Sequence, residues 1–366
     1  MPKAVSIVLT GGPCAGKTTA LSMLSQWLAK RSVTAVVVPE TATLLMQGGL
    51  NPRDPSVSPF DFQHRITTFQ TMMETHFRDI AESYANDRKV VLLFDRGLMD
   101  AKAYVEPAVF EEVLRATGWR EALILERYDA VLHLRTAALG AEAFYTLANN
   151  ATRRESLYEA VAADERTLAA WLGHKHLRII PNESGKTFED KMTNVKKHIA
   201  HTLGIPEPLE IERKFIVDRH QLGDIPVPYK RLSITQTYLD ASKGIEARVR
   251  ATEIEGVATY THTTKRFVRP GVRVEEECRI SAQEYMQFLR TKDPERGPIL
   301  KDRMVFEWSN QYFELDVFTD RKDRLTLLEV ELTDLQDTLI LPPFIPVIRE
   351  VTDDPAYSNA RLAPRL

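Results

Sequence analysis

Apolar runs and amphipathic stretches alternate along roughly the first two hundred residues of the chain. Near-continuous runs of Val, Ile and Leu predict buried strands at 4–10, 33–40, 89–97, 128–136 and 176–182. Between them, Leu21, Leu24 and Leu28 recur at helical spacing, and a longer helical pattern spans about 58–86. Strands that are apolar on both faces and separated by helices are typical of a parallel sheet covered by helices. The pattern therefore predicts an α/β domain with a parallel sheet.

The pattern changes at "LGIPEPLE" (203–210), where prolines separate two different textures. Beyond it, polar and apolar residues alternate in short segments, and helical pattern is limited to about 281–291 and the C-terminal tail. The expected strands are 208–217, 233–239, 245–252, 257–268, 272–281, 299–309, 311–318 and 325–333. We therefore predict two domains, 1–204 and 209–366, joined by a linker at 205–208. The second domain is expected to be mostly antiparallel.

Composition narrows the classes of partner. A net charge of -3 gives no global basic field for nonspecific nucleic-acid binding, although local basic sites leave nucleic acid as a possible partner. The two cysteines, Cys14 and Cys278, form neither a disulfide framework nor a metal quartet. The N-terminal apolar run leads directly into a glycine loop, so we interpret it as a strand and not a signal peptide. No apolar run is long enough to span a membrane. We expect a cytoplasmic protein of undetermined oligomeric state.

The stretch "GGPCAGKTTA" contains the pattern G-x-x-x-x-G-K-[ST], after a predicted strand and at the start of a predicted helix. Glycines let backbone N–H groups curl around phosphate oxygens, and the helix N-terminus adds partial positive charge. Lys17 is expected to reach the β- and γ-phosphates, and the Thr18 hydroxyl to ligate Mg²⁺. The predicted nucleotide-binding loop consists of Gly11, Gly12, Pro13, Cys14, Ala15, Gly16, Lys17, Thr18 and Thr19.

Charged residues end two of the predicted strands. Asp95 and Arg96 end the third strand, and Glu40 ends the second. The carboxyl ends of parallel strands face the ligand crevice, so Asp95 is expected to bind Mg²⁺ and Arg96 to touch phosphate. Glu40 either accepts the proton of an attacking hydroxyl or stabilises the start of the following helix.

Together "GGPCAGKTT", "VVVPE", "FDRG" and "NNATRRESLYEA" resemble a P-loop kinase domain of the nucleoside and nucleotide kinase-like, AAA-type ATPase-like branch. The resemblance covers roughly 1–200. It implies that ATP is the phosphate donor and that Lys17, Glu40 and Asp95 take part in catalysis. It also implies that Arg153 and Arg154 belong to a lid that clamps the donor; a solvated helix face is the alternative. The acceptor pocket is not defined by the sequence, with Phe60, Phe62, His64 and Arg65 as candidates for its walls.

The second domain places charges on alternate residues of its predicted strands. In "LEIERKFIV", Glu210, Glu212 and Lys214 share one face, whereas Ile211 and Phe215 lie on the other. Many of these charges form same-sign pairs two residues apart, which a merely solvated face avoids. Bulky apolar residues on the opposite faces need a covering layer of their own. A closed barrel with a polar interior accounts for both features. Paired carboxylates suit Mg²⁺ or Mn²⁺, and clustered Arg and Lys suit a polyanion.

This arrangement resembles the triphosphate tunnel metalloenzymes of the CYTH superfamily, from about residue 209 to the end. The E-x-E-x-K signature is Glu210, Glu212 and Lys214, and the last-strand E-x-E is Glu329 and Glu331. The resemblance implies an α+β domain built on an eight-stranded antiparallel tunnel barrel, with Lys214 catalytic. The metal ligands that it implies are Glu210, Glu212, Asp316, Glu329 and Glu331. Glu275 and Glu277 either bind metal as well or orient the basic side chains. The triphosphate-binding residues that it implies are Lys214, Arg248, Arg250, Lys265, Arg273, Lys301 and Arg303.

The two resemblances predict a bifunctional phosphotransfer protein, and a fusion in this order also occurs in plant triphosphate-tunnel proteins. The tunnel is expected to hydrolyse inorganic triphosphate or a nucleoside triphosphate, and the first domain to phosphorylate an unknown hydroxyl acceptor. Three alternatives stay open. The P-loop domain could bind ATP only to regulate the tunnel, or the tunnel could act as an adenylate cyclase or as a sensor of polyphosphate or nucleotides.

Overall fold

The computed structural model describes residues 4–142, 145, 156–183, 185–205, 211–241, 245–269, 272–319, 325–332, 338–352 and 354–365. Side chains at 211, 266–269 and 272–276 lie outside this description. The chain divides into two compact units, Met1–Leu203 and Gly204–Leu366. Arg153, Arg154, Glu210 and most of the predicted linker fall outside the described residues.

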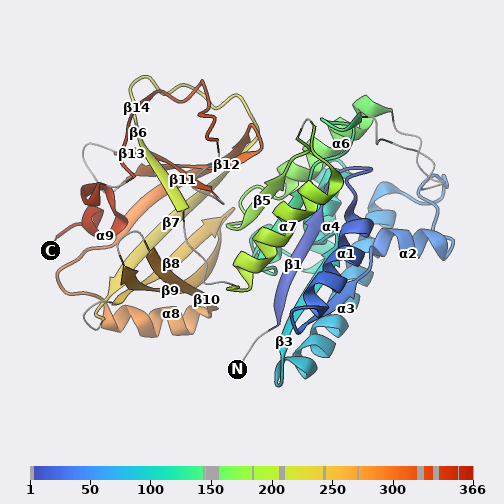
Figure 1. Cartoon of the computed structure of the whole chain (residues 1–366), viewed down its shortest axis with the longest axis horizontal. Helices are drawn as coiled ribbons and strands as arrows, with labels where there is room; N and C mark the ends of the chain where they lie inside the picture. The colour runs from blue at the N-terminus through green and yellow to red at the C-terminus, as the bar shows by residue number, and fades with distance from the viewer. Residues whose placement is uncertain are drawn as a thin grey trace. The chain divides into compact units, whose positions relative to one another are not determined.

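The first unit contains a five-stranded sheet in the order β2-β3-β1-β4-β5, with all neighbouring strands parallel (Figure 1). The strands are β1 (Val5–Thr10), β2 (Val33–Val38), β3 (Lys89–Asp95), β4 (Ala130–Leu134) and β5 (Leu177–Ile180). All five predicted strands and the parallel sheet are confirmed. Ile7, Val8 and Leu9 of the central strand are completely buried. Since β1 lies between β3 and β4, successive connections leave it on opposite sides and open a crevice at its carboxyl end.

Helices cover this sheet. They are α1 (Lys17–Ala29), α2 (Thr41–Gln47), α3 (Pro59–Ala85), η1 (Leu98–Ala103), α4 (Pro107–Thr117), α5 (Glu121–Leu125), α6 (Leu157–Ala170) and α7 (Phe188–Thr202). The long helix predicted at about 58–86 is α3, which begins with Ser58 as its N-cap and Pro59 at its first position. Capping boxes at Ser156 and Thr187 fix where α6 and α7 begin.

The second unit is built on a nine-stranded antiparallel sheet in the order β10-β9-β8-β7-β11-β12-β13-β6-β14 (Figure 1). Its strands are β6 (Ile211–Val217), β7 (Tyr229–Leu239), β8 (Ile245–Ile254), β9 (Val257–Arg269), β10 (Val272–Ile280), β11 (Ile299–Trp308), β12 (Gln311–Phe318), β13 (Thr326–Leu332) and β14 (Val347–Glu350). The short helical elements are α8 (Ala282–Phe288), η3 (Leu289–Thr291), η4 (Pro355–Tyr357) and α9 (Asn359–Leu362). All eight predicted strands are present.

Two expectations need correction. The sequence did not indicate β14, which has only four residues, is mostly exposed, and follows a proline-rich stretch without alternation. It pairs with β6, so the sheet has nine strands. In the part of the chain that the structure describes, β10 and β14 form the two edges and no ladder joins them, so the expected closed eight-stranded barrel is an open sheet here.

The two faces of this sheet differ in character. Phe215, Phe313, Leu328 and Val330 form a buried apolar cluster on one face. Residues after β13, including Leu341, Phe344 and Ile345, cover that cluster. They form the covering layer that the sequence led us to expect over the apolar face of the sheet. The charged side chains lie on the other face. Among the described residues, none of the helices combines the length and apolar character needed to cross a membrane.

Candidate active sites

The loop between β1 and α1 has a shape that requires glycine at both ends. Gly11 has φ 139, and a Cβ there would lie 2.1 Å from the carbonyl oxygen of Leu134. Gly16 has φ 84, and its Cβ would lie 2.5 Å from the ring of Phe188. Both values of φ are in the region that favours glycine. The loop therefore keeps its backbone close to its neighbours and turns directly into the N-terminus of α1.

Lys17 is buried beneath this loop. Its Nζ donates hydrogen bonds to the carbonyl oxygens of Gly11, at 3.2 Å, and Gly12, at 3.3 Å. Burial lowers the pKa of Lys17 to about 8, and the positive charge of Arg96 acts in the same direction. Thr18 and Thr19 are exposed beside it. A cavity of about 1220 Å³ lies over the loop, and Pro13 to Thr19 form part of its lining.

Glu40 and Arg96 form an ion pair in the wall of the same cavity. Glu40 Oε1 accepts a hydrogen bond from Arg96 Nε at 2.6 Å, and Oε2 accepts one from Thr43 Oγ1 at 2.6 Å. Burial opposes ionisation of Glu40, but the charges of Arg96 and Lys17 lower its pKa to about 2. Arg96 NH1 also donates to Asp100 Oδ1 at 3.0 Å. Glu40 is therefore ionised and fixed in position.

Asp95 lies at the end of β3, in register with Leu9 of β1. Burial raises the pKa of Asp95, while Lys17 acts in the opposite direction. Its Oδ1 atom is buried and accepts no hydrogen bond from the described residues. The structure thus brings Lys17, Thr18, Glu40, Asp95 and Arg96 to one cavity. The roles expected of these residues stay predictions. Phe62 lies outside this cavity and lines a second one. Phe60 stacks on His64, with 5.4 Å between the two ring centroids.

In the second unit, three basic side chains form ion pairs with carboxylates on the charged face of the sheet. Asp316 accepts from Arg303 Nε at 2.6 Å and from Arg303 NH2 at 2.7 Å, and it also pairs with Lys301. Glu329 lies 2.9 Å from Lys214 Nζ and 3.3 Å from Arg303 NH2. These contacts join strands β6, β11, β12 and β13.

The side chains of this cluster differ in their exposure to solvent. The side chains of Lys301 and Asp316 are 0% exposed, whereas Lys214 is 9%, Glu314 23% and Glu212 37% exposed. Despite burial, the positive charges of Lys214, Lys301 and Arg303 lower the pKa of Glu329 well below its usual range. Burial and Arg303 lower the pKa of Lys301. Asp316 therefore holds Arg303 in place through two hydrogen bonds and also pairs with Lys301. Direct contact of Asp316 with metal and of Lys301 with phosphate stay predictions.

The other predicted tunnel residues lie further along the sheet. Arg248 and Arg250 are on β8, and Arg250 NH2 donates to Gln236 Oε1 of β7 at 3.3 Å. Lys265 lines a cavity of about 360 Å³. Glu277 accepts from Thr263 Oγ1 at 3.0 Å. The strand register places Glu275 opposite Lys265 and Arg273 opposite Phe267, but the side chains of Arg273 and Glu275 are outside the description.

Comparison with known proteins agrees with this geometry. Residues 6–189 match a family model described as an AAA domain, which is half of the chain. The chain belongs to the AAA domain family.

A further relative is an inorganic triphosphatase of Acetivibrio thermocellus, 32% identical over 158 residues, which are 42% of this chain and 92% of that protein. The crystal structure of the inorganic triphosphatase NE1496 is 28% identical and covers 42% of this chain and 93% of that one, with a TM-score of 0.31. PH1012 of Pyrococcus horikoshii is 19% identical and covers 34% of this chain and 77% of that chain, with a TM-score of 0.27. The AAA family model and the relative from Acetivibrio thermocellus show that the chain joins an AAA domain to a domain related to inorganic triphosphatases, and its role involves nucleotides and phosphotransfer or hydrolysis.

Both units have groups that fit a hard divalent cation. In the AAA domain, these are the buried Asp95 Oδ1 atom and the Thr18 hydroxyl. In the second unit, Glu212 and Glu331 are directly opposite each other on β6 and β13, a like-charge arrangement that a cation between them would relieve. Within the described ranges, no three His, Cys, Asp or Glu side chains are grouped to hold a metal. Glu210, the third predicted carboxylate, is outside those ranges.

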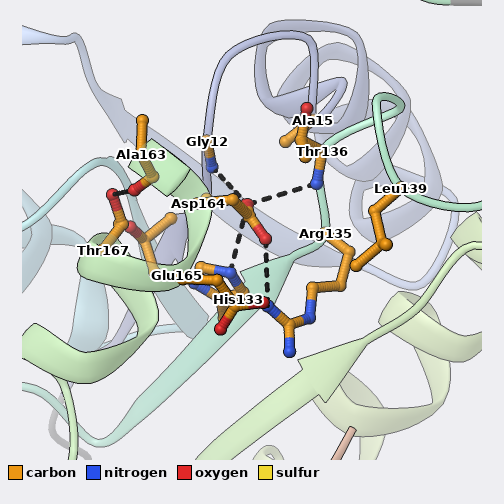
Figure 2. A network of polar contacts seen from close by, with 12 residues as sticks. Gly12, Ala15, His133, Arg135, Thr136, Leu139, Ala163, Asp164, Glu165 and Thr167 are labelled. Atoms are coloured by element: carbon orange, nitrogen blue, oxygen red, sulfur yellow. Dashed lines mark hydrogen bonds and ion pairs between the residues drawn. The ribbon is translucent and has the colours of Figure 1, made fainter. Parts of the chain in front are cut away.

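Sequence analysis missed the residue that holds the loop of the AAA domain. Figure 2 shows Asp164 of α6 accepting hydrogen bonds from the backbone N–H of Gly12 at 2.7 Å and of Thr136 at 3.2 Å. Arg135 donates a hydrogen bond to Asp164 Oδ2 at 3.1 Å. His133 Nε2 lies 3.3 Å from Asp164 Oδ1, the oxygen that accepts the two backbone hydrogen bonds. Although burial opposes ionisation, His133 and Arg135 lower the pKa of Asp164. A signal was available, because Asp164 is a charge on the otherwise uncharged buried face of α6.

We expect Asp164→Asn to weaken ATP binding to the AAA domain about tenfold, because the substitution removes the charge from the hydrogen bond to Gly12, and charge-assisted bonds contribute about 1.5–3 kcal/mol. Titration with a fluorescent ATP analogue and Mg²⁺ measures this. Glu165→Gln is the matched control, since Glu165 contacts Arg135 at 2.7 Å without touching the loop. Equal affinities for the two variants would contradict this account.

We expect Asp316→Asn to lower the free energy of unfolding of the second unit by about 3–5 kcal/mol, because Lys301 would stay buried without the carboxylate it pairs with and Arg303 would lose its two charge-assisted hydrogen bonds to Asp316. Native-state hydrogen exchange of amides in β11 to β13 measures this change. The control is Asp302→Asn, whose carboxylate accepts from Ser233 Oγ at 3.0 Å on the exposed side of β11. It should cost less than about 1 kcal/mol. A loss of similar size in both variants would show that Asp316 is not the required counter-charge.

Proposed function

We propose that the second unit hydrolyses a triphosphate, either inorganic triphosphate or a nucleoside triphosphate, with Mg²⁺ or Mn²⁺. The observation that favours this function most is the ion-paired cluster of Lys214, Arg303 and Glu329 on one face of the sheet. The related protein of Acetivibrio thermocellus is an inorganic triphosphatase, which supports the same activity. Basic side chains fixed by buried carboxylates need no rearrangement when phosphate charge develops.

The proposed reaction uses this cluster as follows. A water oxygen bonds to the terminal phosphorus, and the bond from that phosphorus to its bridging oxygen breaks. Pyrophosphate leaves when the substrate is inorganic triphosphate, and a nucleoside diphosphate leaves when it is a nucleoside triphosphate. The proton of the water passes to solvent. Lys214, Arg250 and Arg303 neutralise the phosphate oxygens, and Asp316 keeps Arg303 in place. Glu212 and Glu331, with Glu210, would hold the metal, which when bound supplies Lewis-acid polarisation of the phosphoryl group and a water of lowered pKa.

We also propose that the AAA domain transfers the γ-phosphate of ATP to a hydroxyl acceptor. A second cavity, of about 850 Å³, supports this function because it shares Glu40, Met46, Arg96 and Tyr104 with the cavity over the loop. Glu40 thus lies between a donor site and an acceptor site. With a pKa of about 2 it is a weak base, so its role is to orient the acceptor hydroxyl by accepting a hydrogen bond. Orientation of the acceptor is the main requirement here, because phosphoryl transfer has a loose transition state that depends little on removal of the hydroxyl proton.

For the hydrolase, we expect Glu212→Gln to reduce orthophosphate release from inorganic triphosphate at least about 100-fold, because a metal carboxylate is lost. Lys17→Ala should change that rate less than about twofold, since the loop belongs to the other unit. The assay uses the full chain with Mg²⁺ or Mn²⁺, and ATP as a second substrate. If the wild type releases orthophosphate from neither substrate, the triphosphatase proposal is wrong.

For the kinase, we expect Glu40→Gln to reduce phosphate transfer about 100-fold while leaving ATP affinity within about threefold, because only the orientation of the acceptor is lost. The assay follows label from the γ-phosphate of ATP into compounds of a deproteinised small-molecule cell extract. Glu183→Gln, a change to another carboxylate of the first cavity, is the control and should leave transfer intact. Unchanged transfer in Glu40→Gln would favour a domain that only binds ATP.

A further inference from the structure

Arg96 has a backbone conformation that is unusual for a residue with a side chain. Its φ is 70, in the left-handed region that favours glycine. Such conformations persist only where surrounding contacts enforce them, and they occur mostly at functional sites. Arg96 directly follows β3 and forms an ion pair with Glu40, and both residues line the two cavities of the AAA domain. The contacts that enforce this conformation therefore also determine where the guanidinium lies.

Asp100 contacts both Arg96 and the peptide that follows it. Its Oδ1 atom accepts a hydrogen bond from Arg96 NH1 at 3.0 Å and another from Thr10 Oγ1. Its Oδ2 atom accepts hydrogen bonds from the backbone N–H of Gly97 at 2.9 Å and from Trp171 Nε1 at 3.3 Å. Because Asp100 is only 3% exposed, water cannot easily replace a lost partner. One carboxylate thus fixes the side chain of Arg96 and the backbone next to it.

The rest of this backbone is held by the sheet and the core. The N–H of Arg96 donates to the carbonyl oxygen of Leu9 in β1 at 3.0 Å. The N–H of Leu98 donates to the hydroxyl of Tyr128 at 3.0 Å, and this hydroxyl donates to Glu74 Oε1 at 2.8 Å. With the backbone fixed in this way, the direction of the Arg96 guanidinium depends on the groups around it.

Three side chains surround that guanidinium. Glu40 accepts from Nε at 2.6 Å, Asp100 accepts from NH1 at 3.0 Å, and the ring centroid of Tyr104 lies 5.4 Å from the guanidinium carbon. Tyr104 is exposed, and Glu40 is partly exposed and would contact the acceptor in the proposed transfer. Asp100 borders the second cavity, but each of its oxygens already accepts two hydrogen bonds. Its part is therefore to hold Arg96 and not to bind a substrate.

We propose that Asp100 is a positioning residue for phosphate transfer in the AAA domain, and that it acts by holding Arg96 against Glu40. This inference rests on the proposed kinase function. In that transfer the acceptor oxygen bonds to the γ-phosphorus of ATP, and the bond from that phosphorus to the β–γ bridging oxygen breaks. ADP leaves, and the hydroxyl proton passes to solvent. Glu40 orients the acceptor hydroxyl and Arg96 orients Glu40, so a change at Asp100 reaches the reaction through Arg96.

The first test is NMR of the Arg96 Nε–H group in the full chain, assigned by its loss in Arg96→Lys. Its proton should exchange slowly with water in the wild type, because it is donated to Glu40 in a partly buried ion pair. Asp100→Asn replaces one accepting oxygen by an amide NH2, and it should speed this exchange at least about tenfold. The matched control is Glu121→Gln, which alters a buried carboxylate that pairs with Lys102 of the same helix, η1, at 2.9 Å. Equal exchange rates in the two variants would overturn the inference.

The second test is transfer of label from the γ-phosphate of ATP into the deproteinised cell extract. Asp100→Asn should lower the initial rate about 30-fold and leave the affinity for the fluorescent ATP analogue within about threefold, because only the orientation of Glu40 is disturbed. In the Arg96→Ala background the same substitution should change the remaining rate less than about threefold, since residues that act through each other are not additive. A further loss as large as in the wild type would show that Asp100 acts independently of Arg96, which overturns the inference.

The two tests separate this inference from the kinase proposal. If the wild type transfers no label, the kinase proposal is wrong, and the exchange of the Arg96 proton still decides whether Asp100 holds Arg96. Transfer that depends on Glu40 but not on Asp100 leaves the kinase proposal intact and overturns the inference. If Asp100→Asn does not fold, as judged by its thermal transition, Thr10→Val removes one donor to Asp100 with little change of volume. This variant should speed the exchange about threefold.

Discussion

Charge that is removed from water has to be balanced, and each unit of this chain meets that requirement with a completely buried aspartate. Asp164 balances Arg135 in the AAA domain, and Asp316 balances Lys301 and Arg303 in the second unit. Neither aspartate is accessible to solvent. Each fixes the group that faces a ligand in the proposed functions, which is the backbone of Gly12 in one unit and the guanidinium of Arg303 in the other.

The two units use different parts of the chain to offer positive charge. In the proposed kinase function, the loop of the AAA domain would contact the phosphates of ATP from one side with backbone N–H groups at the start of α1, and would leave the other side open toward Glu40. The second unit uses side chains from several neighbouring strands, with Lys214 on β6 and Arg303 on β11. Contact with the phosphates from one side suits transfer of a phosphoryl group to a second molecule. A surface of cations and carboxylates suits hydrolysis of the bound triphosphate itself.

The sequence predicted what depends on local pattern. Strands apolar on both faces, alternating strands, the glycine loop and the charged ends of β2 and β3 all follow from residues close together in the chain. The sequence did not predict β14, because four exposed residues contain no periodicity. Barrel closure depends on the pairing of edge strands, which no single strand encodes. Asp164 and the second cavity depend on contacts between distant segments; Asp164 meets Gly12 across 152 positions.

The contact between Asp164 and Gly12 also limits how this sequence can vary. A Cβ at position 12 would lie 2.8 Å from the Cβ of Asp164 and 2.9 Å from its Oδ1 atom. A side chain at position 12 is thus compatible only with a displaced helix α6 or a smaller residue at position 164, and the latter would leave Arg135 without its buried anion. Among descendants of this protein, positions 12, 135 and 164 should change together or stay the same, although the first and last belong to opposite ends of the domain.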